Sequence, residues 1–428
     1  MNNTVLLVSL LTVFIAINVP VAVALGAAAV IVGFLMQGDF NFVGSVLFSS
    51  LQKIELLAIP FFILAGNVFN KCGIMSRLFR LVDSLVGRVH GKTAIVTSGV
   101  SVMLGGLSGS GPADTAALGA TLGPIMKERK YAPGFIGALI SSSGALGLVV
   151  PPSIAFILYG VAVPGISIGK MFIAGIFPGL LIGLLIAVTA YLISKHRKYD
   201  PPRDAVSLAV VGRAFSHSIL GLFAPIIIIG GIYLGIFTPT EAAGVAVIYG
   251  LVVGLVAYRE IGFRDLSEIA RTTALDTATV MFIIACASLF SWIITIDGTI
   301  VQLVGELSAT VSAEWQVFLL AGIVLLIAGL LLDGASIYLI LVPILIPMVR
   351  AQGIDLVWFG VFVAAAVAIG QFTPPVGVNL FVAARVLNIR VEEILSEILP
   401  FITAALIALL LLYFFPALSL WLPSLMPK

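Results

Sequence analysis

Long apolar runs alternate with short polar, glycine-rich or proline-rich stretches along almost the whole chain. Apolar runs of about 18 residues or more are typical of helices that cross a membrane. In the first half the expected crossing helices are 4–18, 20–36, 56–72 and 171–194, with polar amphipathic stretches at 38–55 and 74–91. In the second half they are 219–236, 239–257, 279–296 and 397–422, with amphipathic stretches at 260–276 and 298–314.

Four further apolar segments are interrupted in their middle. The segments 93–127 and 315–349 are expected to be re-entrant hairpins that enter and leave on one side, and 132–164 and 355–388 to be helices broken by prolines. Glycine and proline interrupt helices because the first adopts unusual backbone angles and the second lacks an N–H. Unpaired backbone at membrane depth survives only when it is buried in protein or lines a cavity, so these breaks are expected inside the molecule.

The order of these elements suggests a duplication. Pro347 lies 223 positions after Pro124, and Pro374 lies the same 223 positions after Pro151. We therefore expect two repeats, 1–214 and 215–428. Each would cross the membrane five times, an odd number, so the two would be inverted. The predicted fold class is an all-α polytopic membrane protein with two inverted-topology repeats, about ten crossing helices and two re-entrant hairpins.

Composition and charge support a membrane protein with a defined orientation. Hydrophobic residues make up 61% of the chain and charged residues only 10%, too few charges to cover a soluble protein of this length. The predicted topology puts 18 of the 22 Lys and Arg on one side, leaving Lys53, Lys170, Arg350 and Lys428 on the other. By the positive-inside rule the rich side is cytoplasmic, and both termini are expected on the outer side of the membrane. No basic tract with interleaved aromatics favours nucleic-acid binding.

Inverted repeats with discontinuous helices are typical of secondary transporters, whose ion and solute sites form near the midplane where helices break. A sodium ion prefers the oxygen ligands that backbone carbonyls, hydroxyls and a carboxylate supply. The free N–H groups of the half-helices that follow the breaks favour an anionic solute. The candidate sodium ligands are Ser108, Ser110, Asp114, Ser143, Gly144, Asp333, Ser336, Thr373 and Gly377. The candidate substrate-binding residues are Ser108, Pro152, Ser153, Asp333 and Asn379.

Each candidate also has a purely structural interpretation. Asp114 and Asp333 could cap helices, although acidic residues at membrane depth are costly and usually functional. Ser108 and Ser110 could serve helix packing, as could the small-residue run 141–144.

Other classes of protein fit less well. An intramembrane enzyme is disfavoured because the three histidines, His90, His196 and His217, fall in predicted cytoplasmic loops, and no H-E-x-x-H, G-x-S-x-G or Walker A motif is present. A channel stays an alternative, although breaks rich in Ser, Gly and Asp suit a closed binding site better. Proton coupling through Asp114 or Asp333 is an alternative to sodium coupling.

Three motifs carry a family resemblance: Ile59–Gly66, Ser108–Thr115 and Phe372–Gly377. With them, nearly the full length of the chain resembles the large membrane subunit of TRAP (tripartite ATP-independent periplasmic) transporters, the DctM type. Within that family it looks most similar to the sialic-acid subunits.

The resemblance implies further properties. Such subunits reside in the bacterial inner membrane and work with a small four-helix membrane subunit and a periplasmic substrate-binding protein. They import carboxylates, here sialic acid or alternatively a C4-dicarboxylate, together with sodium. Their transport domain, with both hairpins, is thought to move as an elevator against a scaffold that would include the arms 38–55 and 260–276.

Overall fold

The computed structural model describes residues 3–17, 19–201, 207–298, 313–332 and 334–426, and these fold into helices without a strand. The helices up to residue 197 are α1 (Asn3–Ala16), α2 (Val21–Gln37), α3 (Asn41–Leu51), α4 (Ala58–Lys71), α5 (Ile74–Leu85), α6 (Lys92–Ser108), α7 (Gly111–Glu128), α8 (Pro133–Gly144), α9 (Ile154–Ala162) and α10 (Ile168–Arg197). Those that follow are α11 (Leu208–Tyr233), α12 (Pro239–Val252), α13 (Phe263–Asp297), α15 (Glu314–Leu331), α16 (Gly334–Ala351), α17 (Leu356–Gly370), α18 (Val378–Leu387), α19 (Val391–Phe414) and α20 (Ala417–Ser424). The all-α prediction is confirmed.

Seven helical stretches in the described ranges are long and apolar enough to cross a membrane. Six contain α4, α10, α11, α12, α13 and α19, which correspond to predicted crossing helices, and the seventh is α16, the second arm of the predicted hairpin 315–349. Shorter apolar helices, including α1, α2 and α17, correspond to other predicted crossings. The division into inverted repeats at 214/215 stays a prediction.

The predicted interruptions occur where glycine and proline stand. Gly109 has a left-handed φ of 64° and ends α6, and α7 begins two residues later with Pro112 in its first turn. The helix 132–164 is divided into α8, a 3₁₀ turn over Ala145–Leu148 and α9, with the Pro151–Pro152 pair before α9. Both hairpin arms of 315–349 are helical, as α15 and α16.

Two boundaries differ from the prediction. The amphipathic arm 260–276 and the crossing helix 279–296 form one continuous helix, α13, because no glycine or proline stands between Phe263 and Asp297. The final helix, expected at 397–422, is divided into α19 and α20 at Pro416.

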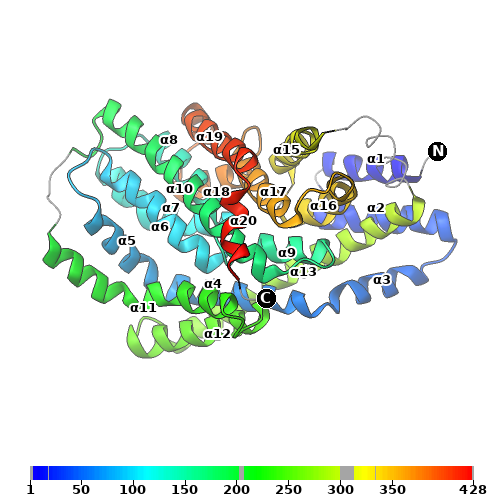
Figure 1. Cartoon of the computed structure of the whole chain (residues 1–428), viewed down its shortest axis with the longest axis horizontal. Coiled ribbons are helices and arrows are strands. Elements are labelled where there is room, and N and C mark those ends of the chain that lie inside the picture. The colour runs from blue at the N-terminus through cyan, green and yellow to red at the C-terminus, as the bar shows by residue number, and fades with distance from the viewer. Residues whose placement is uncertain (1–2, 18, 202–206, 299–312, 333, 427–428) are drawn as a thin grey trace.

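Two helices that lead into breaks, α8 and α17, are buried in the protein. Every residue of α8 from Gly134 to Gly144 is buried, and so is every residue of α17 from Trp358 to Gly370. α8 packs against α19 and α7, and α17 packs against α15 and α10. Around them, α4 packs on α12 and α2 on α13, and Figure 1 shows α1 to α3 at the opposite end of the molecule from α5 and α11. The breaks after α8 and α17 are therefore enclosed by protein.

Candidate ion and substrate site

The break between α6 and α7 gathers hydroxyl and carboxylate oxygens. The Ser108 hydroxyl donates a hydrogen bond to Oδ1 of Asp114, which stands in the first turn of α7. The same hydroxyl accepts one from the Ser110 backbone N–H at 3.2 Å. Asp114 is only 1% exposed, and its Oδ2 has no hydrogen-bond partner among the described residues. The carboxylate is thus oriented by one partner and keeps a free oxygen.

The turn after α8 packs directly onto this break. A Cβ on Gly147 would lie 2.4 Å from Oδ2 of Asp114, and a Cβ on Gly144 would lie 2.1 Å from Oγ1 of Thr115. Close approach without a side chain is what glycine permits. The carbonyl of Ser143 accepts a hydrogen bond from the Ser101 hydroxyl, while the Ser143 hydroxyl itself is buried and has no partner in the described ranges.

The break between α17 and α18, in the second half of the chain, also contacts α8 and the start of α7. Nδ2 of Asn379 donates to the Ser141 carbonyl at 3.2 Å, and the Asn379 backbone N–H donates to the Gln371 carbonyl at 2.9 Å. A Cβ on Gly111 would lie 2.6 Å from Oε1 of Gln371 and 3.3 Å from Nδ2 of Asn379. These contacts bring residues more than 200 positions apart together beside the first hairpin.

Among the buried side-chain oxygens that have no hydrogen-bond partner in the part of the chain that the structure describes, four belong to residues of the break segments themselves. They are Oδ2 of Asp114, Oγ of Ser143, Oε1 of Gln371 and Oδ1 of Asn379. Buried polar atoms are almost always paired, so each of these needs an explanation, and a bound cation or water is one. Carboxylate, hydroxyl and amide oxygens are hard donors of the kind that sodium prefers.

Most predicted sodium ligands lie beside these breaks. Ser108, Ser110, Asp114, Ser143 and Gly144 come together at the first hairpin. Thr373 and Gly377 lie at the second break, where the Thr373 hydroxyl donates to the Ile369 carbonyl at 2.6 Å. The Gly377 backbone N–H donates to the Leu330 carbonyl at 3.3 Å, and its φ is 50°. Ser336 is buried in α16. Asp333 lies outside the described residues.

The predicted substrate-binding residues are placed more diffusely. Ser108 lines a cavity of about 390 Å³ between the first break and helices α4 and α13, with Asn67 and Asp276 on the opposite wall. Ser153 is 1% exposed, bonds the Leu148 carbonyl at 2.7 Å and caps α9, so its hydroxyl has a structural role. Pro152 and Asn379 are buried.

Sequence reasoning missed several polar residues at these cavities. Gln371 and Tyr338 both line a second cavity of about 170 Å³ between the two hairpins, together with Ser110. Gln371 could have been predicted as a site residue because it stands three positions before Pro374, within the second break. Asn67 and Asp276 stand on helices that show no break, so only the packing of α4 against α13 reveals them.

Comparisons with known proteins identify the family. Residues 8–418 match the family model described as "Tripartite ATP-independent periplasmic transporter, DctM component". The C4-dicarboxylate TRAP transporter large permease protein of Rhodobacter capsulatus is 33% identical over 440 residues, covering 99% of both chains. The sialic acid large permease protein of Vibrio cholerae is 36% identical, covering 90% of each.

Two further matches differ in length or in identity. The isethionate TRAP transporter permease protein DctMQ of Oleidesulfovibrio alaskensis is 36% identical over 95% of this chain, which spans 64% of that longer protein. The solved YdaH transporter of Alcanivorax borkumensis, described as having an unusual topology, covers both chains fully with a TM-score of 0.61 at 16% identity, a likeness of fold alone.

The TRAP relatives are named as permeases, and the family description makes the matched component part of a tripartite assembly. The chain therefore belongs to the DctM component family of tripartite ATP-independent periplasmic transporters, and is a multi-pass permease component of the bacterial inner membrane rather than an enzyme.

Proposed function

We propose that this chain is the permease of a sodium-driven secondary transporter that imports an organic acid anion. The observation that carries the proposal is the set of four buried, unpartnered oxygens near the paired helix breaks. A sodium ion near Asp114 would supply the missing partner of its Oδ2. Secondary transporters bind ions at helix breaks near the bilayer midplane, where the two repeats meet.

The anion is proposed to bind beside the first hairpin. At the start of α7 the backbone N–H of Ala113 belongs to a residue that lines the cavity of about 390 Å³, whereas Pro112 has no N–H and that of Asp114 donates to the Ser110 carbonyl at 3.0 Å. A helix N-terminus attracts negative charge, so sodium and anion would stabilise each other there. Because this cavity separates the hairpin from α4 and α13, movement of the hairpin past these helices would carry the solute in an elevator mechanism.

The resemblance favours sialic acid as the substrate. Relatives named for isethionate, C4-dicarboxylate and sialic acid are 33–37% identical to this chain. These names share an anionic group, a carboxylate or a sulfonate, so the class is an organic acid anion. Sialic acid is the member to test first, and a C4-dicarboxylate is the alternative.

Two partners complete the proposed transporter. One is a small four-helix membrane subunit, as the combined name DctMQ and the greater length of the isethionate relative suggest. The other is a periplasmic substrate-binding protein, the third component of a tripartite assembly. Both termini of this chain are proposed to lie in the periplasm.

Uptake into proteoliposomes that contain all three components tests the proposal. Labelled sialic acid, a C4-dicarboxylate and isethionate are each offered under a sodium gradient and then under a proton gradient alone. We expect one of the anions to accumulate with sodium only. Equal accumulation under the proton gradient would refute sodium coupling, and dissipation without counter-flow exchange would indicate a channel.

A further inference from the structure

A basic cavity of about 520 Å³ lies between α5 and α11, away from the breaks. Its lining includes Arg77 and Arg80 of α5, Lys92 at the start of α6, and Arg213 and His217 of α11. Asp83 is the only acidic residue among the described lining residues. We propose that this cavity binds the phosphate headgroup of an anionic phospholipid.

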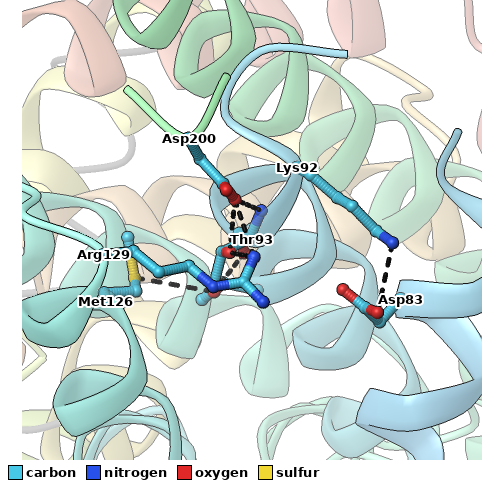
Figure 2. A network of polar contacts seen from close by, with 7 residues as sticks. Asp83, Lys92, Thr93, Met126, Arg129 and Asp200 are labelled. Carbon is cyan, nitrogen blue, oxygen red and sulfur yellow. Dashed lines mark hydrogen bonds and ion pairs between the residues drawn. The ribbon is translucent and has the colours of Figure 1, made fainter. Parts of the chain in front are cut away.

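Two of the cations are free to bind an anion. Figure 2 shows Lys92 paired with Asp83, at an Nζ–Oδ2 distance of 3.2 Å, so these charges offset each other. Arg77 pairs with Glu260 at 2.7 Å. Arg80 and Arg213 are exposed, and neither has an acidic partner among the described residues. The cavity therefore keeps a net positive charge that a phosphate can neutralise.

The surroundings favour a lipid over free phosphate. Phe215, Phe223 and Ile226, which follow Arg213 along α11 toward the middle of the helix, are 48%, 44% and 60% exposed. α11 is one of the helices long and apolar enough to cross a membrane, and Arg213 stands near its charged end. If α11 crosses, this end would meet the lipid headgroups. Basic pockets between helices, next to exposed apolar surface, are the places where anionic headgroups bind. The acyl chains would cover the exposed apolar side chains of α11.

The proposed lipid would join elements that the ion site does not join. Its phosphate would lie among α5, α11 and the first turn of α6, the helix that leads into the Ser108–Asp114 break. The proposal is independent of the transported solute and ion, since it requires only that α11 crosses the membrane. Loss of the headgroup would remove one contact between α11 and the entrance to the hairpin.

The test measures binding of acyl-labelled phosphatidylglycerol to the purified full-length chain in detergent, by fluorescence anisotropy. We expect R80Q/R213Q to weaken binding roughly 30-fold, because each cation near an anionic headgroup contributes about a fivefold factor in affinity. The matched control is R264Q/R271Q, which removes two exposed arginines of α13 and changes the net charge equally. R80K/R213K preserves the charge and is expected to bind nearly as the parent does.

Several outcomes would overturn the proposal. An equal loss in R264Q/R271Q would mean general electrostatic attraction rather than a site. Binding of phosphatidylcholine as tight as that of phosphatidylglycerol would remove the role of the net charge. Displacement of the labelled lipid by millimolar inorganic phosphate would show that the ligand is a free anion. A loss in R80K/R213K as large as in R80Q/R213Q would show that the charge is not what binds, and size-exclusion profiles confirm that each variant is folded.

Discussion

At the scale of a residue, Asp114 is buried at a cost in folding free energy, and that cost points to a function for its carboxylate. Its carboxyl is 1% exposed, Oδ1 accepts from Ser108, and Oδ2 faces Gly147 without a partner in the described part of the chain. A buried polar atom left unsatisfied costs about 1–3 kcal/mol, more when it is charged. Protein sites tolerate such a cost where function needs the atom, and a bound cation would remove it.

Gly144, the last residue of α8, packs closely against Thr115 of α7, and this contact can be tested by a single substitution. Its backbone is helical, with φ −60°, so alanine is excluded only by contact: the added Cβ would lie 2.1 Å from Oγ1 and 2.7 Å from the backbone N of Thr115. We expect Gly144→Ala to lower the free energy of unfolding by about 1–3 kcal/mol, because α7 must move away from α8. Denaturant unfolding in detergent measures this.

The control is Gly212→Ala in α11, where a Cβ meets nothing within 4 Å. That change should leave stability unchanged or raise it by about 0.4–1 kcal/mol, since alanine reduces the entropy of the unfolded chain. If Gly144→Ala were as stable as Gly212→Ala, the close packing of α8 against Thr115 would be incorrect.

At the scale of elements, α6 receives its N-terminal cap from a distant loop. Figure 2 shows Asp200 beside Thr93 and Arg129: Oδ2 of Asp200 accepts from the Thr93 backbone N–H at 3.1 Å, the Thr93 hydroxyl at 2.7 Å and Arg129 at 2.8 Å. The residue before α6, Gly91, offers no side chain for this purpose. Asp200 thus ties the end of α10 to both arms of the first hairpin.

The pH dependence of stability tests this cap. Burial raises the pKa of Asp200, but hydrogen bonds from Thr93 and the charge of Arg129 outweigh it, and the pKa lies below its usual value. The ionised form therefore stabilises the fold above the ordinary pKa of about 4, and this stabilisation is lost as the pH falls through the lowered pKa. We expect Asp200→Asn to cost roughly 1–3 kcal/mol at neutral pH, a cost that shrinks only below about pH 4.

Thermal unfolding of the parent chain and of Asp200→Asn, followed between neutral and acidic pH, provides the measurement. Asp39→Asn, at an exposed loop residue that bonds Asn41, is the matched control and should change little. A cost for Asp200→Asn that stayed constant across the whole range would argue against an ionised cap.

The elements show what a sequence can predict. The breaks at Gly109, Pro151 and Pro374 were predictable because glycine and proline act locally. α13 was not predicted as one helix, because the change from charged to apolar residues near 277 marks a change of surroundings and not an end of the helix. Asn67 and Asp276 became site residues through the packing of α4 against α13, which no local pattern encodes.

At the scale of the whole molecule, the predicted orientation depends on the distribution of charge. Exposed Lys170 starts α10, and exposed Arg264 lies at the start of α13, on opposite predicted sides. In a chain whose two buried cysteines are replaced (Cys72→Ala, Cys286→Ala), we expect Lys170→Cys to react with an impermeant maleimide in intact spheroplasts. Arg264→Cys should react only after the membrane is disrupted. Labelling of both from outside would contradict the predicted number of crossings, and the reverse pattern would contradict the orientation.

Sodium bound by both halves of the chain is the central claim, and equilibrium binding of radioactive sodium to the purified chain tests it most directly. We expect saturable binding that Asp114→Asn and Gln371→Met each weaken by about tenfold or more, as loss of metal-site partners does elsewhere. The controls Asp355→Asn, at an exposed helix cap, and Gln37→Met, at an exposed helix end, should bind as the parent does. Absence of saturable binding, or parental affinity in both Asp114→Asn and Gln371→Met, would contradict the account.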